Sequence, residues 1–336
     1  MILKREENGP VWREILNDGI AILEAAGVPD ADHDAFELLS AAFGVSRTHF
    51  YLDADRPVRG ELLAKCGSTY RENLKKRAER IPLQQILGST WFMGLEFAVN
   101  EHVLCPRPDT ETLVEAVLAD VPDPDAGILD LCTGSGCIAI SLAYHGKYRK
   151  VEAVDISRDA LNIARTNAKK ILSVQKGILT SRVRNIAADP LEMHLTGLFS
   201  KNGGKANLSA GGATEEREFI LREGDLFGAV PDGEKYRVIV SNPPYIPTAD
   251  CETLMPEVRD HEPRIALDGD ADGLRFYRIL AEKAAGCLER GGRVYYEIGF
   301  DQAESVSGLL EKAGYSDIRV LKDLGGLDRV VTAEYS

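Results

Sequence analysis

The chain of 336 residues lacks several features that would assign it to other classes of protein. It has no apolar run of about 18 residues, and residues 1–5 are followed by acids instead of the apolar core of a signal peptide. Its six cysteines form no CxxC pair, and its six histidines form no cluster with metal-ligand spacing. We therefore expect a soluble, cytoplasmic protein with reduced thiols and no metal site.

An excess of positive charge is also lacking, because 53 acids outnumber 40 bases and give a net charge of −13. Proteins that grip nucleic-acid backbones usually carry a basic stripe. The bases Lys75, Lys76, Arg77 and Arg80 do cluster, but acids are interspersed among them, as is typical of a solvated helix face. The charge balance favours a protein acceptor over nucleic acid, although a local patch can differ from the net charge.

The most informative motif is Asn-Pro-Pro-Tyr at residues 242–245, directly after the apolar run 238–240. The run predicts a buried strand, so the motif lies at a carboxyl end, where open α/β sheets bind ligands. An Asn oxygen and a prolyl carbonyl can each accept one N–H of a planar NH2 group. Two prolines fix φ and offer no N–H, and Tyr offers a flat face for stacking. The segment predicts a clamp for an amide or amino group; the plainer alternative is a Pro-Pro turn that leaves a strand.

A second motif joins a short apolar strand at 128–131 to a glycine turn at 132–136 and an apolar helical pattern. Such a turn lets the backbone approach a ligand beside a helix N-terminus. Asp155 ends the next apolar run, where an acid can bind both hydroxyls of a ribose. The arrangement is typical of adenosine cofactors, and its glycines also fit the dinucleotide fingerprint. A tight turn with a solvated acid is the alternative.

The Asn-Pro-Pro-Tyr motif decides between a dinucleotide and another adenosine cofactor. Hydride transfer from a dinucleotide does not need a clamp for an amino group, whereas methylation of an amino group does. We therefore infer S-adenosylmethionine as the donor, with S-adenosylhomocysteine as the product. Catalysis would consist mostly of positioning, with the two acceptors stabilising positive charge that develops on the nitrogen. No strong base is needed before attack, since the proton becomes acidic only once the new bond forms. The absence of a convincing His or Glu base near the motif in the sequence is therefore compatible with this chemistry.

Ten further short motifs, some of which overlap those above, follow one another along residues 80–336. They are residues 82–88, 92–97, 106–111, 154–157, 224–227, 241–246, 262–263, 272–273, 297–299 and 323–329. With these motifs the chain resembles the HemK/PrmC family, the glutamine-N5 methyltransferases of peptide-chain release factors. The tetrapeptide alone is shared with DNA and RNA amino-methyltransferases, whereas 106–111 together with 325–329 is much more specific.

The resemblance implies a role for each matching residue. The donor's amino-acid portion would be lined by Cys132, Thr133, Gly134, Ser135 and Gly136; Asp155 would hold its ribose, and Asp225 and Leu226 would flank its adenine. The substrate glutamine would be clamped by Asn242, Pro243, Pro244 and Tyr245, with Asn242 also near the donor and Asn242, Pro243 and Tyr245 as the catalytic set. The implied acceptor is the glutamine of the Gly-Gly-Gln loop in class-1 release factors. We expect a monomer that contacts neither nucleic acid nor membrane.

Two departures from the family pattern carry expectations of their own. Cys132 stands where the family usually has glycine, and a side chain at positive φ costs on the order of 1 kcal/mol. We therefore expect an ordinary backbone angle and a small buried hydrophobe there. The second departure is an insertion at about 172–218 with Gly- and Ser-rich runs, which predicts a flexible surface loop. A lid or partner contact is the alternative.

The predicted fold is α/β, a class I (Rossmann-like) methyltransferase sheet with a small helical bundle before it and a β-hairpin between them. We expect the bundle over residues 1–80 as a candidate release-factor contact or a structural cap, the hairpin over 81–105, and the catalytic domain over 106–336. Arg107 is left open between a place over the active site and a structural ion pair.

Two other functions compete with glutamine methylation. One is an adenine-N6 or cytosine-N4 nucleic-acid methyltransferase, which would need a basic groove and a target-recognition segment, and neither is visible in the sequence. The other is an adenosine-binding scaffold that has lost catalysis, which would need a damaged acceptor clamp.

Overall fold

The computed structural model describes residues 9–172, 193–199 and 215–336. The chain forms two compact units, one of Met1–Ser89 with Met255–His261 and the other of Thr90–Leu254 with Glu262–Ser336. Within the described residues, the helices are all too short or too polar to cross a bilayer.

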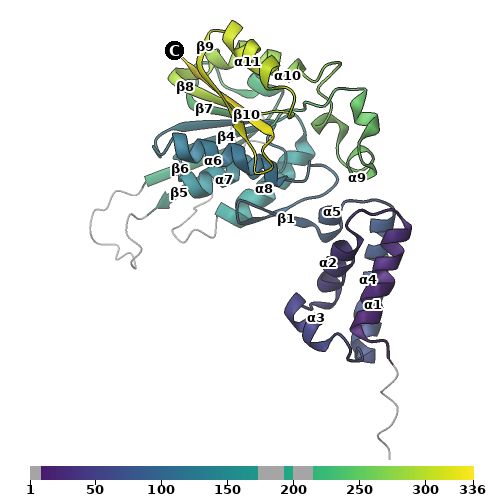
Figure 1. Cartoon of the computed structure of the whole chain (residues 1–336). Helices are drawn as coiled ribbons and strands as arrows, with labels where there is room; N and C mark the ends of the chain where they lie inside the picture. The colour runs from purple at the N-terminus through teal and green to yellow at the C-terminus, as the bar shows by residue number, and fades with distance from the viewer. Residues whose placement is uncertain (1–8, 173–192, 200–214) are drawn as a thin grey trace, which may run out of the picture. The chain divides into compact units, whose positions relative to one another are not determined.

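The first unit is helical, as predicted (Figure 1). Its helices are α1 (Trp12–Ala25), α2 (Ala31–Phe43), α3 (Arg47–Asp53), α4 (Gly60–Ala78), α5 (Leu83–Leu87) and α9 (Pro256–Arg259). Apolar residues at helical spacing bury one face of each long helix, and Trp12 packs edge-to-face on Phe43 with ring centroids 5.3 Å apart. Gly44 ends α2 in the left-handed conformation that glycine allows.

Two of the clustered bases in α4 and after it are not on a solvated helix face, which corrects the expectation from sequence. Arg77 is 5% exposed and donates to Asp34 (2.6 Å) and to Glu257 (2.8 Å). Arg80 donates to both oxygens of Glu257, at 2.7 and 2.6 Å. The ion pairs compensate the buried guanidinium charges, because an unpaired buried charge destabilises the fold. The network joins α9 to the helical unit.

The second unit contains an eight-stranded sheet in the order β5-β6-β4-β3-β7-β8-β10-β9. Its strands are β3 (Gly127–Leu131), β4 (Lys150–Asp155), β5 (Met193–Phe199), β6 (Glu215–Glu223), β7 (Tyr236–Ser241), β8 (Leu288–Glu297), β9 (Tyr315–Lys322) and β10 (Asp328–Tyr335). The five strands β6, β4, β3, β7 and β8 are parallel, and the terminal pair β9–β10 is antiparallel. The class I arrangement predicted from the sequence is confirmed.

Helices cover both faces of this sheet (Figure 1). They are α6 (Glu111–Asp120), α7 (Cys137–Ser141), α8 (Arg158–Leu172), α10 (Arg275–Lys283) and α11 (Ala303–Lys312). The alternation along β7 sorts its side chains between two cores: Val238 and Val240 pack with α6, α7 and α8, and Ile239 packs with α10 and α11. A strand buried on both faces needs the continuous apolar run that marked it in the sequence.

The linking hairpin is present as a two-stranded sheet of β1 (Ser89–Phe92) and β2 (Leu95–Ala98). The range expected for the hairpin, residues 81–105, also contains the short helix α5, so its first part is not a strand. Pro82 stands before this short helix and Gly88 ends it with φ 75°.

The insertion expected to be a loop contains a strand. β5 pairs antiparallel with β6, with Leu195 opposite Phe219, so the expectation is wrong for 193–199. The pairing supplies partners for the backbone groups at the edge of β6, which an isolated loop would leave unmet. The Gly- and Ser-rich runs, and with them the lid alternative, lie outside the described residues.

Candidate active site

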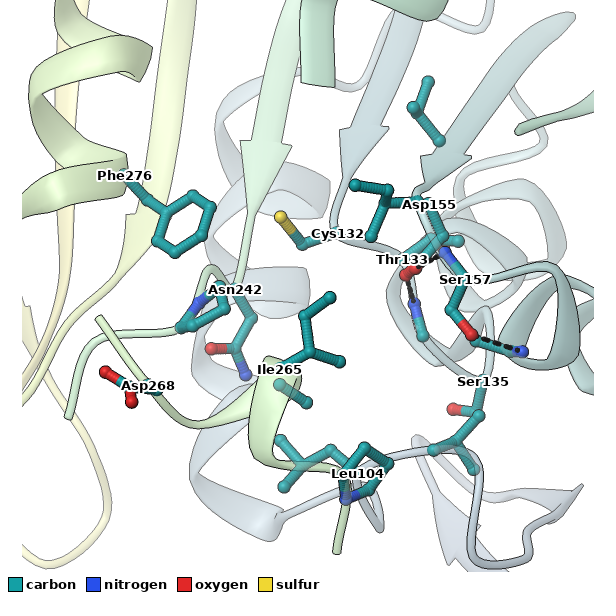
Figure 2. A pocket seen from close by; sticks show the side chains of 18 of the residues that line it. Leu104, Cys132, Thr133, Ser135, Asp155, Ser157, Asn242, Ile265, Asp268 and Phe276 are labelled. Carbon is teal, nitrogen blue, oxygen red and sulfur yellow. Dashed lines mark hydrogen bonds between the residues drawn. The ribbon is translucent and has the colours of Figure 1, made fainter. Parts of the chain in front are cut away.

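A cavity of about 650 Å³ lies at the carboxyl ends of β3, β4, β6 and β7 (Figure 2). The central strand β3 has β4 on one side and β7 on the other. This reversal of strand order is the place where open parallel sheets bind ligands, and the volume is typical of small-molecule sites. The wall contains Cys132, Thr133, Gly134, Ser135, Asp155, Asp225, Leu226, Asn242 and Pro244 from the predicted set.

The glycine turn after β3 is held in place by hydrogen bonds from Thr133 to β4 and to the Asp130 side chain. The Thr133 N–H donates to the Val154 carbonyl (3.0 Å), and the Thr133 hydroxyl donates to Asp130 (2.6 Å). Gly134 has φ 56°, and a Cβ there would meet no heavy atom within 4 Å, so its backbone faces open space. This is the cradle that a ligand approaching the backbone requires.

Gly136 does not line the cavity. It has φ 79° and begins α7, and a Cβ on it would lie 2.8 Å from Ile140 and 3.1 Å from Ala164. Its glycine is therefore required by close packing of the turn against α7 and α8, and any effect on a donor would be exerted through the shape of the turn.

Cys132 has φ 62°, so the expectation of an ordinary backbone angle is wrong. The turn that leaves β3 requires a left-handed residue, and the side chain there costs roughly 1–2 kcal/mol. The cysteine is partly buried and packs on the core beneath α10, as expected for a small hydrophobe, yet it also lines the cavity. Burial raises the pKa of its thiol, and the nearby Asp155 carboxyl raises it further. Figure 2 shows the sulfur on the side of Phe276.

Asp155 lies at the end of β4 with both carboxyl oxygens fixed. One oxygen accepts from the Gly134 N–H (2.7 Å) and the other from the Ser157 N–H (2.8 Å). Burial raises the pKa of this carboxyl, and the backbone N–H groups oppose the rise. Each oxygen has a further lone pair available for a ligand hydroxyl. Asp225, which is exposed, and the buried Leu226 line the wall beyond Asp155.

The Asn-Pro-Pro-Tyr corner follows β7 on the opposite wall from Asp155 (Figure 2). Asn242 and Pro244 line the cavity, Pro243 is buried, and Tyr245 is half-buried without being part of the wall. The Asn242 side-chain N–H donates to the Thr110 hydroxyl at 3.4 Å. The corner thus presents an amide and a diproline backbone to the space next to the glycine turn.

The corner is supported from behind by two glycines. A Cβ on Gly269 would lie 2.8 Å from the Tyr245 Cα, and one on Gly273 would overlap the Tyr245 carbonyl oxygen. Gln302 donates to that same carbonyl at 2.9 Å. The backbone of the corner therefore has little room to move.

Glu297 was not identified from the sequence, and the structure places it next to the acceptor corner. β8 pairs in register with β7, Ser241 opposite Tyr296, so Glu297 ends its strand beside Asn242. The Tyr245 hydroxyl donates to Glu297 at 3.4 Å. Burial raises the pKa of this carboxyl to about 7, which the Thr110 hydroxyl, Arg329 and Tyr245 oppose. The signal in the sequence was an acid at the end of an apolar strand, which needs the strand register to become informative.

The sequence left Arg107 open between a place over the active site and a structural ion pair, and the structure shows that it both lines the cavity and forms an ion pair. Its guanidinium donates to both oxygens of Glu262 at 2.9 and 2.8 Å, and it also lines the cavity. The side chain of Glu262 is completely buried and accepts a third bond from the Cys105 N–H (3.2 Å). The ion pair fixes the strand-to-helix connection on which the cavity wall is built.

Comparison with known proteins gives two family models and several relatives. Residues 14–88 match the model described as PrmC N-terminal domain, and residues 108–194 match the methyltransferase small domain. The release factor glutamine methyltransferase of Geobacter sulfurreducens is 38% identical over 97% of this chain and 98% of its own length. Those of Caulobacter vibrioides and Cereibacter sphaeroides are each 36% identical, over 92% and 95% of this chain and 91% and 97% of their own.

Proposed function

The chain belongs to the release factor glutamine methyltransferases, and from this premise we propose that it transfers a methyl group from S-adenosylmethionine to the side-chain nitrogen, N5, of a release-factor glutamine. The finer assignment, the glutamine of the Gly-Gly-Gln loop in class-1 factors, rests on the resemblance of the motifs. The observation that carries the proposal is the juxtaposition of the Asn-Pro-Pro-Tyr corner and Asp155 across one cavity.

The residues of the cavity fit the proposed donor. Asp155 keeps lone pairs for the two ribose hydroxyls, and the open backbone at Gly134 leaves room for the amino-acid portion. Asp225 and Leu226 would flank the adenine, with Leu226 as the apolar surface. When bound, S-adenosylmethionine supplies a methyl group on a positively charged sulfur.

The acceptor corner would bind and orient the glutamine amide. The Asn242 oxygen and the Pro243 carbonyl can each accept one N–H of the carboxamide, and the Tyr245 ring can pack on its plane. Holding both hydrogens in the amide plane leaves the nitrogen's remaining face as the direction of attack. The same two oxygens stabilise the positive charge that grows on the nitrogen as the bond forms. The proton is then acidic enough to leave to water.

The proposal is tested by mass spectrometry on an intact class-1 release factor incubated with the enzyme and S-adenosylmethionine. We expect one added methyl on the glutamine of the Gly-Gly-Gln peptide and none on a factor in which that glutamine is replaced by alanine. Methylation elsewhere in the factor, or none with a donor-binding enzyme, would contradict the proposal. Transfer of labelled methyl to DNA or RNA would favour the nucleic-acid alternative instead.

A release-factor substrate also implies work in the cytoplasm, and we retain the prediction of a monomer. Sedimentation of the purified chain tests the second point, since a dimer would appear as a species of twice the mass.

A further inference from the structure

We propose that Glu297 and Thr110 are positioning residues that set which way the Asn242 carboxamide faces, so that its oxygen is turned toward the acceptor amide. The inference deepens the proposed function and rests on it. Neither residue was part of the predicted site, and neither has a role in the clamp as described so far.

The side chains of Asn242, Thr110 and Glu297 follow one another at the acceptor corner, and we call this row of polar groups the line. Thr110 ends the short helix η1 (Pro108–Thr110), is 2% exposed, and accepts from the Asn242 side-chain N–H at 3.4 Å. Thr110 is also the first of the groups that oppose the rise in the pKa of the buried Glu297 carboxyl. Oε1 of Glu297 accepts from the Tyr245 hydroxyl at 3.4 Å, and the buried Oε2 accepts no hydrogen bond from any of the described residues. An acceptor is therefore available for the Thr110 hydroxyl.

The chemistry of these groups gives the line a direction. A carboxylate only accepts, so a Thr110 hydroxyl that turns toward the free Oε2 of Glu297 gives its single hydrogen to that oxygen. The Thr110 oxygen can then only accept, and the group of Asn242 that faces it must be the NH2. The Asn242 oxygen is consequently left for an N–H of the substrate. A reversed Asn242 carboxamide would turn its NH2 group toward the N–H groups of the substrate amide. Donors would then face donors, and the substrate amide would not be held.

The same logic makes the direction depend on the charge of Glu297. A protonated Glu297 can donate to the Thr110 oxygen, which frees the Thr110 hydrogen for the Asn242 oxygen and reverses the line. The groups that face Glu297 are Thr110, Tyr245, Arg329, Asp109, Cys137 and Tyr277, whose hydroxyl donates to the Glu297 backbone carbonyl at 2.6 Å. Arg329 is shared with Asp323 (3.0 Å) and Asp109 (3.7 Å), so it neutralises Glu297 only in part.

Keeping an acid in this place is costly, which favours a role beyond packing. Glu297 is 2% exposed, and a buried carboxylate oxygen without a full set of partners destabilises the fold. The end of β8 could instead have been filled by an apolar side chain of similar volume.

The first test compares Thr110→Val with Thr110→Ser, measuring turnover on the release factor and donor affinity by calorimetry. We expect Thr110→Val, which keeps the shape and removes the hydroxyl, to lower kcat by roughly tenfold, the value of one hydrogen bond, without changing the donor Kd. Thr110→Ser restores the hydroxyl and should recover most of the turnover. Thr332→Val removes a buried hydroxyl on β10, outside the line, and should leave kcat unchanged.

The second test uses the pH profile of kcat. We expect wild-type turnover to fall as the pH drops through about 7, because Glu297 then takes up a proton. Glu297→Gln should have a low kcat without that inflection, since its amide donates at every pH.

The possible failures are distinguishable. A wild-type enzyme that methylates the factor while Thr110→Val behaves like wild type overturns the inference alone, as does a Thr110→Ser variant no better than Thr110→Val. An inflection kept by Glu297→Gln overturns it as well. A wild-type enzyme that does not methylate any release factor overturns the proposed function, and the inference falls with it.

Discussion

Replacement of Gly273 by alanine tests whether the acceptor corner must be held rigidly. The residue has φ 72°, and an added Cβ would overlap the Tyr245 carbonyl oxygen and lie 2.7 Å from the Gln302 amide nitrogen. The left-handed angle costs alanine roughly 1–2 kcal/mol, and loss of the Gln302 bond to Tyr245 about 1 kcal/mol more. We expect the free energy of unfolding to fall by about 2–3 kcal/mol.

The larger effect should be on turnover. Relief of the overlap moves the backbone of Tyr245, and a misplacement of about 1 Å in a positioned site can cost roughly 100-fold in rate. Donor affinity should change little, because Gly273 lies outside the cavity wall. Calorimetry with S-adenosylhomocysteine, single-turnover methylation and chemical unfolding measure the three quantities separately.

Gly233→Ala is the matched control. Gly233 has φ 85°, precedes β7 at the opposite end of the strand from the corner, and has no heavy atom within 4 Å of an added Cβ. It should show only the backbone cost, roughly 1–2 kcal/mol, with full turnover. If Gly273→Ala matched this control in rate as well as in stability, the reasoning that the corner is supported from behind would be refuted.

Three further substitutions test the donor side, the clamp and the buried acid. Asn242→Ala should abolish methylation while donor binding stays measurable in calorimetry, whereas equal loss of both would mean a structural role. Asp155→Ala should weaken donor binding by about 1.5–3 kcal/mol, the value of hydrogen bonds to a charged group; an unchanged Kd would move the ribose contact elsewhere. Glu297→Gln should raise stability in urea unfolding at pH 8. Because burial raises the pKa of Glu297 from 4.5 to about 7, the folded state loses stability as the pH rises between these values. The gain should be at most about 3 kcal/mol at pH 8 and should vanish near pH 4, and a gain independent of pH would contradict this sign.

The sequence predicted which residues lie together where each of them directly follows a buried strand. Asp155 and Asn242 are far apart in the chain, but each comes at the end of an apolar run. Because β4 and β7 are parallel to β3, which lies between them, their carboxyl ends meet at one edge of the sheet. Strand patterning alone was therefore sufficient to bring Asp155 and Asn242 to the wall of one cavity.

The supporting residues could not be predicted in this way. Glu297 acquires its place from the register of β8 on β7, and Gly273 acquires its place from a loop that folds back on Tyr245. Neither contact has a periodic signal in the sequence. The angle at Cys132 was misjudged because the cost of a side chain at positive φ was given more weight than the geometry of the turn, which accepts that cost.

The central claim is that a glutamine carboxamide is held by the diproline corner beside the adenosyl donor. The most direct measurement is a crystal structure of the enzyme with S-adenosylhomocysteine and a Gly-Gly-Gln peptide. We expect the carboxamide nitrogen within hydrogen-bonding distance of the Asn242 oxygen and the Pro243 carbonyl, with its open face toward the thioether sulfur. A glutamine bound away from these two oxygens, or a nucleoside bound away from Asp155, would contradict the account.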